Sequence, residues 1–408
     1  MKKLHFTGIG GAGMAPLAEL SLARGFAVSG SDECDSPKCR HLRESGAVVE
    51  IGHRKENLPD DAALLIYSSA VPENNPERVK ARELGIKQLR RGEYLAELAA
   101  GYQRCVAITG THGKSSITAA LVSILHQCGR DPGYMIGAEV AGMSNFAPGD
   151  GDIFVTEADE SDGTHKLLKN FLAVIPNIED DHEWSLGGKA VLDENFRKTA
   201  QNSAKLIYYV SPECERLLGT HPDAVMLTEM PSTFAGARGF QAANAFIAAQ
   251  AAVILGCDRE QAYQAAQNYP QVARRMTLHP AKGNYTVIED YAHHPTEVHS
   301  AIELLRMRYP GSHLRILFQP HRFARLEKYF AEFAAELRQA DSLYIAPVFA
   351  AWSESGKVDS NALAKAAGGK AVSGTFADWA AETVRDLPEN AVIAILGAGD
   401  IDKVIPYL

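Results

Sequence analysis

A glycine-rich turn between an apolar run and an amphipathic run constrains the fold of this chain more than any other feature. The stretch VAITGTHGKSSITAAL, residues 106–121, is typical of a buried strand, a tight turn and the first turns of a helix. Gly110 and Gly113 allow successive backbone N–H groups to point into one concavity, and the helix N-terminus adds partial positive charge. The stretch therefore predicts a phosphate-binding loop in an α/β domain.

Lys114 and Ser115 follow the second glycine and complete the pattern G-x-x-G-K-S. We expect the Lys114 ammonium to reach the outer phosphates of a nucleotide and the Ser115 hydroxyl to bind Mg²⁺. The usual loop has one more glycine, at the position that Ile108 occupies, so this loop is a compressed variant. The alternative is a structural glycine turn that carries a solvated lysine.

Acidic side chains follow the next two predicted strands. Glu157 ends the strand predicted over residues 153–156, where a phosphate loop needs a metal-binding acid. Glu160 and Asp162 follow on the loop, and a solvated acidic loop fits them better than it fits Glu157. Further on, His182 in VIPNIEDDHEW is either a ligand of a second metal or a satisfied loop histidine, and the nearby phosphate loop favours the ligand.

The N-terminal region has a second glycine turn. Gly8, Gly10 and Gly13 form G-x-G-x-x-G directly after the first predicted strand, and Asp32 ends the next strand at the spacing of a ribose-binding acid. Taken alone, this pattern predicts an NAD site. Any ligand that contains a diphosphate can use the same turn, and a purely structural turn is a third possibility.

In the C-terminal region, histidine, tyrosine and arginine follow two predicted strands. In EDYAHHPTE, Tyr291 and His293 stand at a strand end, and because adjacent histidines point apart on a strand, we favour substrate contacts over a metal site. In LFQPHRFAR, Arg322 and Arg325 are three residues apart, which suits a clamp for a carboxylate or a phosphate. For Arg325 the alternative is a solvated helix face.

Short apolar strands and amphipathic segments alternate along the chain, which predicts an α/β fold with parallel sheets. Because 408 residues exceed one ordinary domain, we expect two to three domains. A net charge of -9 argues against broad binding to nucleic acid or to an anionic membrane. No apolar run approaches the roughly 18 residues that cross a bilayer, so we expect no membrane insertion and a cytoplasmic protein. In that compartment we expect the six scattered cysteines to be reduced.

The motifs occur in a specific order along nearly the whole chain. They are GIGGAG, TGTHGKSS, EADESD, NIEDDH, the helix with Asn244, Arg274–Arg275, DYAHHPTE and FQPHR. In spelling and order they resemble the Mur ligases, ATP-dependent enzymes that form amide bonds in peptidoglycan precursor synthesis. The resemblance implies a Rossmann-like domain over residues 1–102 that binds a UDP sugar, a shortened P-loop domain over 103–279 that binds ATP, and a Rossmann-like domain over 280–408 that closes over ATP and the amino acid.

The resemblance also implies a reaction between UDP-N-acetylmuramate and an amine, with ATP and Mg²⁺. The lactyl carboxylate of the sugar would attack the γ-phosphate of ATP, and the amino group would then attack the acyl phosphate. Within the family, GIGGAGMA, EADESD, HHPTE and FQPHR are most similar to the branch that adds L-alanine, and also to a recycling branch that attaches a ready-made tripeptide. A Mur-like binding protein without turnover and a nicotinamide-dependent oxidoreductase stay open as rival functions. We expect a monomer or a weak homodimer.

By position, the resemblance assigns roles to individual residues. The catalytic residues would be Lys114, His182 and Arg322, and the metal ligands would be Ser115, Glu157 and His182. The ATP site would comprise Gly110, Thr111, His112, Gly113, Lys114, Ser115, Ser116, Asn244, Arg275 and Asp290. The UDP sugar would contact Gly8, Gly10, Gly11, Gly13, Ser31, Asp32, Ser68 and Ser69. The amino acid would contact Tyr291, His293, Arg322 and Arg325.

The chain departs from the family pattern in three places. Glu183 and Trp184 stand in DHEWSLGG, where the family usually has DHMD or similar. The adenine helix starts with Phe240 and Gln241 rather than with His-Asn, and the stretch before it is much shorter than usual. The shortened central domain is the motive for considering a binding protein without turnover.

Overall fold

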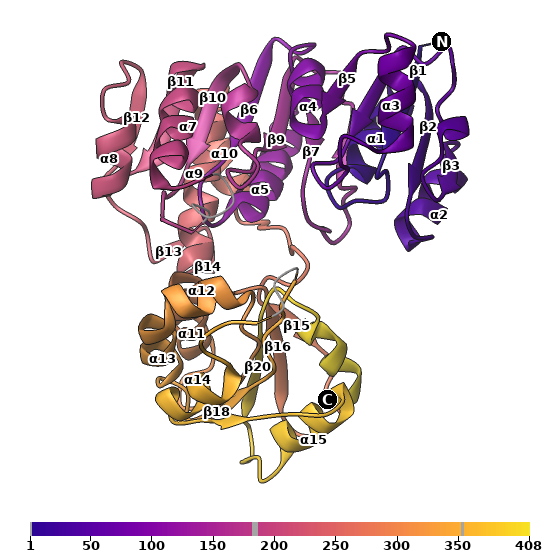
Figure 1. Ribbon diagram of the computed structural model, residues 1–408. Coiled ribbons are helices and arrows are strands. Elements are labelled where there is room, and N and C mark those ends of the chain that lie inside the picture. Colours follow the sequence, from indigo (N-terminus) through magenta and orange to yellow (C-terminus); the bar gives the residue numbers. More distant parts are fainter. Residues whose placement is uncertain (1, 182–186, 352–354) are drawn as a thin grey trace. The chain divides into compact units, whose positions relative to one another are not determined.

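The chain forms two compact units. A computed structural model describes residues 2–181, 187–351 and 355–408. The first unit comprises Met1–Met230 and Asn244–Pro270, and the second comprises Pro231–Ala243 and Gln271–Leu408. Helix α9 (Phe240–Ile254) contributes residues to both units. Figure 1 shows the course of the chain through its sheets and helices.

The first unit begins with a five-stranded parallel sheet in the order β3-β2-β1-β4-β5. Its strands are β1 (Lys3–Thr7), β2 (Ala27–Asp32), β3 (Val48–Ile51), β4 (Leu64–Tyr67) and β5 (Gln88–Arg90). The connecting helices are α1 (Ala15–Ala23), α2 (Pro37–Glu44), η1 (Lys55–Asn57) and α3 (Pro76–Glu83), and α4 (Arg91–Ala99) follows the last strand. The order reverses at β1, and open α/β sheets bind ligands beyond the carboxyl ends of the strands at such a reversal, here β1 and β4.

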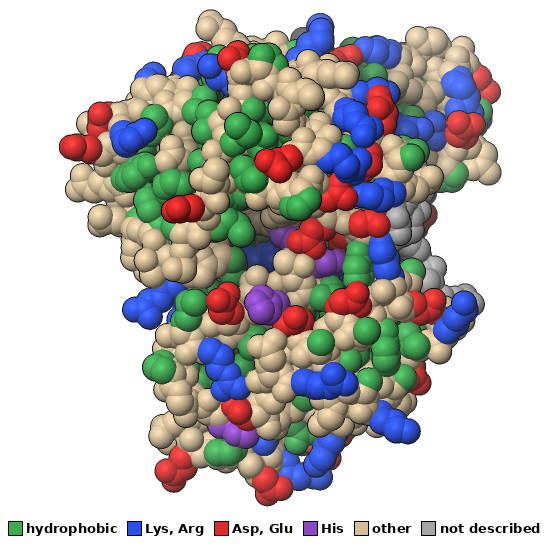
Figure 2. Space-filling view, turned by 90° about the vertical axis from the view of Figure 1, so that its left-hand side faces the viewer, with side chains coloured by type: hydrophobic (Ala, Val, Ile, Leu, Met, Phe, Trp, Pro, Cys, Tyr) green, Lys and Arg blue, Asp and Glu red, His purple; other side chains and the backbone are tan. Residues whose placement is uncertain are grey.

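The second sheet of this unit has seven strands in the order β12-β11-β10-β6-β9-β7-β8, and all but β8 are parallel. The strands are β6 (Arg104–Ile108), β7 (Gly133–Met135), β8 (Phe146–Ala147), β9 (Ile153–Glu157), β10 (Asn170–Ile175), β11 (Ser203–Tyr209) and β12 (Ala224–Leu227). The helices are α5 (Lys114–Gln127), η2 (Thr164–Leu167), α7 (Lys189–Gln201), α8 (Pro212–Leu218) and α10 (Arg259–Ala265), together with most of α9. Figure 2 shows hydrophobic side chains on the face that carries α8 and the edge strand β12, to which the exposed Val225 and Met226 belong.

The second unit contains a six-stranded sheet in the order β15-β16-β20-β17-β18-β19, with β15 antiparallel at one edge. The strands are β15 (Thr277–His279), β16 (Thr286–Asp290), β17 (Leu314–Phe318), β18 (Ser342–Ile345), β19 (Lys370–Ala371) and β20 (Val392–Leu396). The helices are α11 (Pro295–Arg308), α12 (Phe323–Lys328), α13 (Phe330–Leu337), α14 (Ser360–Ala367), α15 (Phe376–Val384) and η3 (Ile401–Tyr407), and a hairpin joins β13 (Thr233–Phe234) to β14 (Ala237–Arg238). Two separate apolar clusters show that helices cover both faces of this sheet.

The predicted α/β class with parallel sheets is confirmed by these three sheets. The domain boundaries predicted after residues 102 and 279 stay predictions. Within the described part of the chain, no helix combines the length and the apolar character needed to cross a bilayer. None of the six cysteines is in a disulfide.

Candidate functional site

The predicted phosphate loop lies between β6 and α5, and both of its glycines are required by the geometry. Gly110 has a φ of +108° and Gly113 a φ of +86°, values that side chains with a Cβ rarely adopt. A Cβ on Gly110 would lie 2.5 Å from the carbonyl oxygen of Asn177, and one on Gly113 would lie 2.9 Å from Oδ1 of Asn244. The loop is therefore packed tightly against the segment after β10 and against α9, which carries the predicted ATP residue Asn244.

The segment after β10 also holds the loop by hydrogen bonds. The backbone N–H of His112 donates to Oδ1 of Asn177 over 2.8 Å, and Nδ2 of Asn177 donates back to the carbonyl oxygen of His112 over 3.3 Å. The N–H of Glu179 donates to Oγ1 of Thr111 over 2.8 Å. These contacts fix the middle of the loop, and no sequence pattern predicted this role for Asn177 or Glu179.

Lys114 folds back over its own loop and meets a carboxylate. Its Nζ donates to the carbonyl oxygens of Gly110 over 2.7 Å and Thr111 over 3.2 Å, and to Oε2 of Glu160 over 3.0 Å. Burial by itself would lower the pKa of Lys114, but the carboxylates of Glu160 and Asp159 raise it above its usual value. The ammonium therefore stays charged, and phosphate oxygens would compete with these ligands for it.

Two acidic residues near Lys114 are withdrawn from solvent, Glu157 in part and Glu160 completely. Oε2 of Glu157 accepts from the Ser115 hydroxyl over 2.9 Å, and its Oε1 accepts from the N–H of Gly137 over 2.6 Å. Glu160 is 1% exposed, and burial raises its pKa to about 7 although Lys114 acts in the opposite direction. The expectation that Glu160 is solvated is wrong, because the loop turns its side chain inward onto Lys114. Asp162, on the same loop, is exposed as expected.

These side chains suit Mg²⁺. The Ser115 hydroxyl and the Glu157 carboxylate touch each other, and hard oxygen donors of this kind are the ligands that Mg²⁺ prefers. Burial raises the pKa of Glu157, so a divalent cation would relieve an unfavourable buried charge. The third predicted ligand, His182, lies outside the described residues, as do Glu183 and Trp184.

The second glycine turn follows β1 and is held by β2. The N–H groups of Gly8 and Ile9 donate to the carbonyl oxygen of Ser31 over 2.8 and 2.9 Å. The N–H of Gly10 donates to Oδ2 of Asp32 over 2.8 Å, so Asp32 holds the turn in shape. Seven of the predicted UDP-sugar residues gather at the carboxyl ends of β1, β2 and β4, and the eighth follows them on an exposed loop. The seven are Gly8, Gly10, Gly11, Gly13, Ser31, Asp32 and Ser68, and the eighth is Ser69.

A buried carboxylate lies behind this turn. Oε2 of Glu77 accepts from the hydroxyls of Ser31 and Thr7 over 2.7 and 2.8 Å, and Oε1 accepts from Nδ2 of Asn57 over 2.8 Å. The ring of His5 lies 3.1 Å from Oε2. Burial acts to raise the pKa of Glu77, but His5, Ser31 and Asn57 together lower it to about 2. The sequence offered no signal for this role, because PERVKARE has the composition of an exposed helix.

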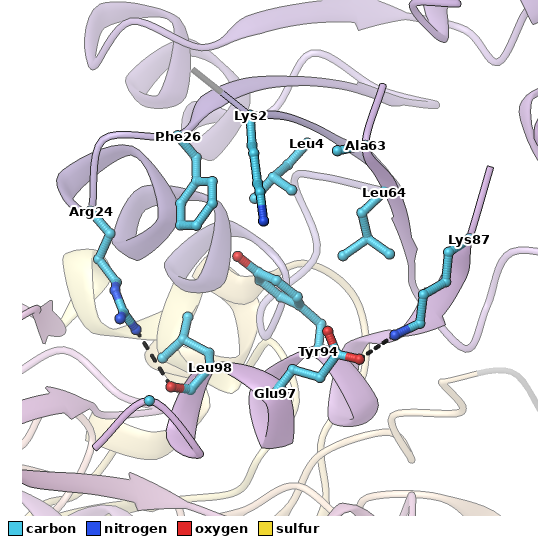
Figure 3. Close-up of a pocket in the computed structure, with 11 residues that line it drawn as sticks. Lys2, Leu4, Arg24, Phe26, Ala63, Leu64, Lys87, Tyr94, Glu97 and Leu98 are labelled. Atoms are coloured by element: carbon cyan, nitrogen blue, oxygen red, sulfur yellow. Dashed lines mark hydrogen bonds and ion pairs between the residues drawn. The ribbon is translucent and has the colours of Figure 1, made fainter. Parts of the chain in front are cut away.

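The opposite edge of the same sheet contains a cavity of about 300 Å³. Figure 3 shows Tyr94 and Leu98 of α4 facing the amino-terminal ends of β1 and β4, with three cationic side chains and one carboxylate around them. These charged residues are Lys2, Arg24, Lys87 and Glu97. Because the glycine turn follows the carboxyl end of β1, this cavity is separate from the predicted UDP-sugar residues.

In the second unit, Tyr291 is the centre of a group of predicted residues beyond β16. The guanidinium carbons of Arg274 and Arg275 lie 5.0 and 5.3 Å from the centre of its ring. The ring of His293 lies 5.3 Å from that of Tyr291 and 5.6 Å from that of His321. The structure therefore brings Arg275, Tyr291 and His293 together, and it adds Arg274 and His321.

The two arginines of FQPHRFAR lie at the start of α12. Arg325 is 1% exposed, and its Nη1 lies 3.1 Å from Nδ1 of His321, so the alternative of a solvated helix face is wrong. Arg322 has a φ of +69°, and its N–H donates to the carbonyl oxygen of Phe349 over 2.8 Å. A positive φ is energetically costly for a residue that has a Cβ. Such backbone conformations occur often at functional sites, where they position a side chain.

Asp290 joins two segments that carry predicted residues. Its oxygens accept from the N–H of Met276 over 2.9 Å and from the N–H of Ala292 over 2.8 Å. Burial raises its pKa to about 6, against the effect of Arg275. Asp290 therefore fixes the segments on either side of Tyr291, besides the ribose contact predicted for it.

Family models match two parts of the chain. The model described as Mur ligase family, catalytic domain, matches residues 3–103, and the model described as Mur ligase, glutamate ligase domain, matches residues 274–401. A UDP-N-acetylmuramate–L-alanine ligase from Paenarthrobacter aurescens (strain TC1) is 34% identical over 445 residues, which covers 100% of this chain and 96% of the relative. One from Aquifex aeolicus (strain VF5) is 33% identical over 450 residues, covering 99% and 96%.

Solved structures share the fold. A UDP-N-acetylmuramate–alanine ligase from Thermotoga maritima superposes with a TM-score of 0.81 at 24% identity, covering 100% of this chain and 98% of the other. A murein peptide ligase from Psychrobacter arcticus 273-4 has a TM-score of 0.68 at 19% identity, covering 99% and 97%.

The Glu77 cluster predicts a stability effect. Glu77→Gln is expected to lower the free energy of unfolding by about 2–3 kcal/mol, because the amide leaves buried donors without an acceptor. Urea unfolding measures the change. Glu83→Gln, on the exposed end of the same helix, is the control and should change stability by less than about 0.5 kcal/mol. Equal losses in the two variants would contradict the role of Glu77.

Glu160 predicts a dependence of stability on pH. Its pKa is about 7 in the folded chain and 4.5 when exposed, so folding takes up a proton between these values. The free energy of unfolding should therefore fall as the pH rises from about 5 to 7.5, by about 2–3 kcal/mol from this group. Glu160→Gln, which keeps the shape of the protonated acid, should remove this part of the slope. Parallel stability curves for wild type and variant would show that Glu160 is not the group that titrates.

Proposed function

The chain belongs to the Mur ligase family, and we propose that it is a cytoplasmic ligase that joins L-alanine to the lactyl carboxylate of UDP-N-acetylmuramate. Members of this family are ATP-dependent ligases that form amide bonds. The match to relatives named UDP-N-acetylmuramate–L-alanine ligase over almost their full length supports this choice of sugar and amine. The reaction is a step of peptidoglycan precursor synthesis.

The observation that carries this proposal is the partly buried cluster of charged side chains at the phosphate loop. A carboxylate is a poor acyl donor at neutral pH until one of its oxygens is phosphorylated. Phosphoryl transfer to the sugar carboxylate brings several negative charges together, and the Lys114 ammonium lies where it can neutralise them. The Ser115 hydroxyl and the Glu157 carboxylate would hold Mg²⁺, which supplies Lewis-acid stabilisation of the phosphates when bound.

The bonds change in two steps. A carboxylate oxygen of the sugar forms a bond to the γ-phosphorus while the bond from that phosphorus to ADP breaks. The amine nitrogen of L-alanine then bonds to the acyl carbon, loses a proton, and phosphate leaves with the bonding electrons. The residues of this chain bind and orient the substrates: the loop N–H groups receive phosphate oxygens, and Arg322 and Arg325 receive the carboxylate of the amino acid.

There are two rival functions: one adds a different amine, and the other binds the ligands without catalysing a reaction. The likeness in fold to a murein peptide ligase keeps the tripeptide-adding branch as the second candidate. The second rival is a binding protein without turnover, which would explain a shortened central domain. The alignment with the P. aurescens relative is 445 residues long and this chain has 408 residues, so the relative contains residues that have no counterpart here. The contact of Ser115 with Glu157 and that of Lys114 with Glu160 keep a cation and a metal-binding carboxylate at the phosphate loop, which argues for turnover. Release of ADP from ATP with UDP-N-acetylmuramate and a panel of amines distinguishes these functions.

Lys114 is expected to be essential for turnover and dispensable for binding the sugar nucleotide. Lys114→Ala should reduce ADP release at least about 100-fold, because the charge at the transferred phosphoryl group is lost. Calorimetric titration with UDP-N-acetylmuramate should give the wild-type affinity, since the glycine turn after β1 is a separate element. Lys198→Ala, an exposed lysine on α7, is the control for loss of a surface charge. Loss of sugar binding in Lys114→Ala alone would contradict this division of roles.

Arg325 is expected to affect the amino acid more than ATP. Arg325→Lys should raise the KM for L-alanine about tenfold or more and leave that for ATP nearly unchanged, because lysine does not reproduce the bidentate fork. A tripeptide presents its reacting amine far from its terminal carboxylate, so its KM should change less. An equal rise in both the ATP and the L-alanine KM would exclude the clamp. Exclusive use of the tripeptide by the wild type would assign the chain to the recycling branch.

A further inference from the structure

Arg91 lies between the glycine turn and the acidic loop of the first unit. It is the first residue of α4, directly after β5 of the first sheet. Its Nη2 forms an ion pair with Asp162 and donates to Oγ1 of Thr164 over 3.3 Å, so it contacts the loop that also carries Glu160. The other side of its guanidinium faces Gly13. One cation therefore touches both motifs.

The contact with Gly13 explains why a glycine stands there. A Cβ built on Gly13 would lie 2.9 Å from Cδ of Arg91, 3.1 Å from Nη1 and 3.2 Å from Nε. Unlike Gly8, Gly13 does not have a positive φ, so the backbone does not require a glycine at this position. The third glycine of G-x-G-x-x-G therefore makes room for the arginine.

The guanidinium has donors to spare on the side of the turn. Both of its contacts with the acidic loop use Nη2, and among the residues that the structure describes neither Nε nor Nη1 forms a hydrogen bond. These two nitrogens are the ones nearest to Gly13. The side chain is 21% exposed, so a ligand can reach it, and Nε and Nη1 carry N–H donors of the planar guanidinium that suits the oxygens of a phosphate or a carboxylate.

We propose that Arg91 binds an oxyanion of the sugar nucleotide at the end of the glycine turn. The inference rests on the proposed function, which supplies the ligand. The oxyanion belongs either to the diphosphate or to the lactyl carboxylate, and both offer oxygens that the guanidinium can bind. Because Arg91 also contacts the loop of Glu160, binding there ties the position of the sugar nucleotide to the residues around Lys114.

The ion pair with Asp162 acts against this binding. The Asp162 carboxylate holds part of the guanidinium charge, so an incoming oxyanion meets a partly neutralised cation. Oδ1 of Asp162 accepts from the N–H of Thr164 over 2.9 Å, and an asparagine keeps that acceptor. Asp162→Asn therefore removes the competing charge without removing the contact that shapes its loop.

A purely structural ion pair predicts a different outcome. Its two side chains are 21% and 30% exposed, and pairs of this kind contribute little to stability. If the pair served only to join the loop to α4, removal of either partner would have the same effect. If Arg91 binds ligand, the two variants act in opposite directions.

Calorimetric titration separates these two roles. UDP, UDP-N-acetylglucosamine and UDP-N-acetylmuramate are titrated into the full-length wild type and into Arg91→Ala, Arg91→Lys, Asp162→Asn and Arg216→Ala. The last variant removes an exposed arginine of α8 that pairs with Asp193 of α7 and Glu213 of α8, and it controls for loss of a surface ion pair. Thermal unfolding of each variant confirms that it is folded.

We expect Arg91→Ala to weaken binding of UDP-N-acetylmuramate about tenfold or more. Arg91→Lys should recover part of the affinity, Asp162→Asn should bind as tightly as wild type or more tightly, and Arg216→Ala should not differ from wild type. Loss of affinity for all three ligands would assign the oxyanion to the diphosphate. Loss for UDP-N-acetylmuramate alone would assign it to the lactyl carboxylate.

Two results would overturn the inference while the proposed function stands. In the first, the wild type binds UDP-N-acetylmuramate and Arg91→Ala binds it equally well. In the second, Arg91→Ala and Asp162→Asn weaken binding to the same extent, as a structural pair requires. A wild type that binds none of the three nucleotides would overturn the proposed function, and this inference with it.

Discussion

The register between β6 and β9 is the constraint on which the candidate site of the first unit depends. The two strands are parallel, with Ile108 opposite Glu157, so the phosphate loop and the acidic loop leave the sheet at the same level. This alignment brings the Ser115 hydroxyl to Glu157 and the Lys114 ammonium to Glu160. A shift of the register by one residue would move Glu157 to the other side of the sheet and break up the cluster.

Inside that cluster the charges are unequal. One ammonium lies near the carboxylates of Glu157, Asp159 and Glu160, and burial raises the pKa of both glutamates. Such an arrangement is costly until cations arrive, which is typical of a site built to hold a metal ion and a nucleotide. The buried Glu77 is the opposite case: its charge is matched by hydrogen bonds from Ser31, Thr7 and Asn57, and it supports the glycine turn.

Local patterns in the sequence were sufficient for the parts of the site that depend on the backbone. The glycine spacing around Lys114 predicted a strand, a turn and a helix, and the structure has β6, a loop with two glycines at positive φ, and α5. The burial of Glu160 was not predictable in the same way, because no periodicity tells which way a loop side chain turns. Asn177 and Arg91 contact residues 65 and 71 positions away in the chain, and such contacts become visible only once the strand order is known. Arg325 was predicted as a clamp from its spacing, whereas its burial against His321 follows from the packing of α12.

In the proposed reaction, ATP held at the phosphate loop phosphorylates the carboxylate of the sugar. Transfer of oxygen from that carboxylate to phosphate reports on this step. UDP-N-acetylmuramate labelled with ¹⁸O in its lactyl carboxylate is converted with ATP and L-alanine, and the released phosphate is analysed by mass spectrometry. We expect each turnover to place one labelled oxygen in inorganic phosphate, because the bond from the acyl carbon to that oxygen breaks when the amine attacks. Phosphate without label, or label recovered in a nucleoside monophosphate, would exclude activation through an acyl phosphate.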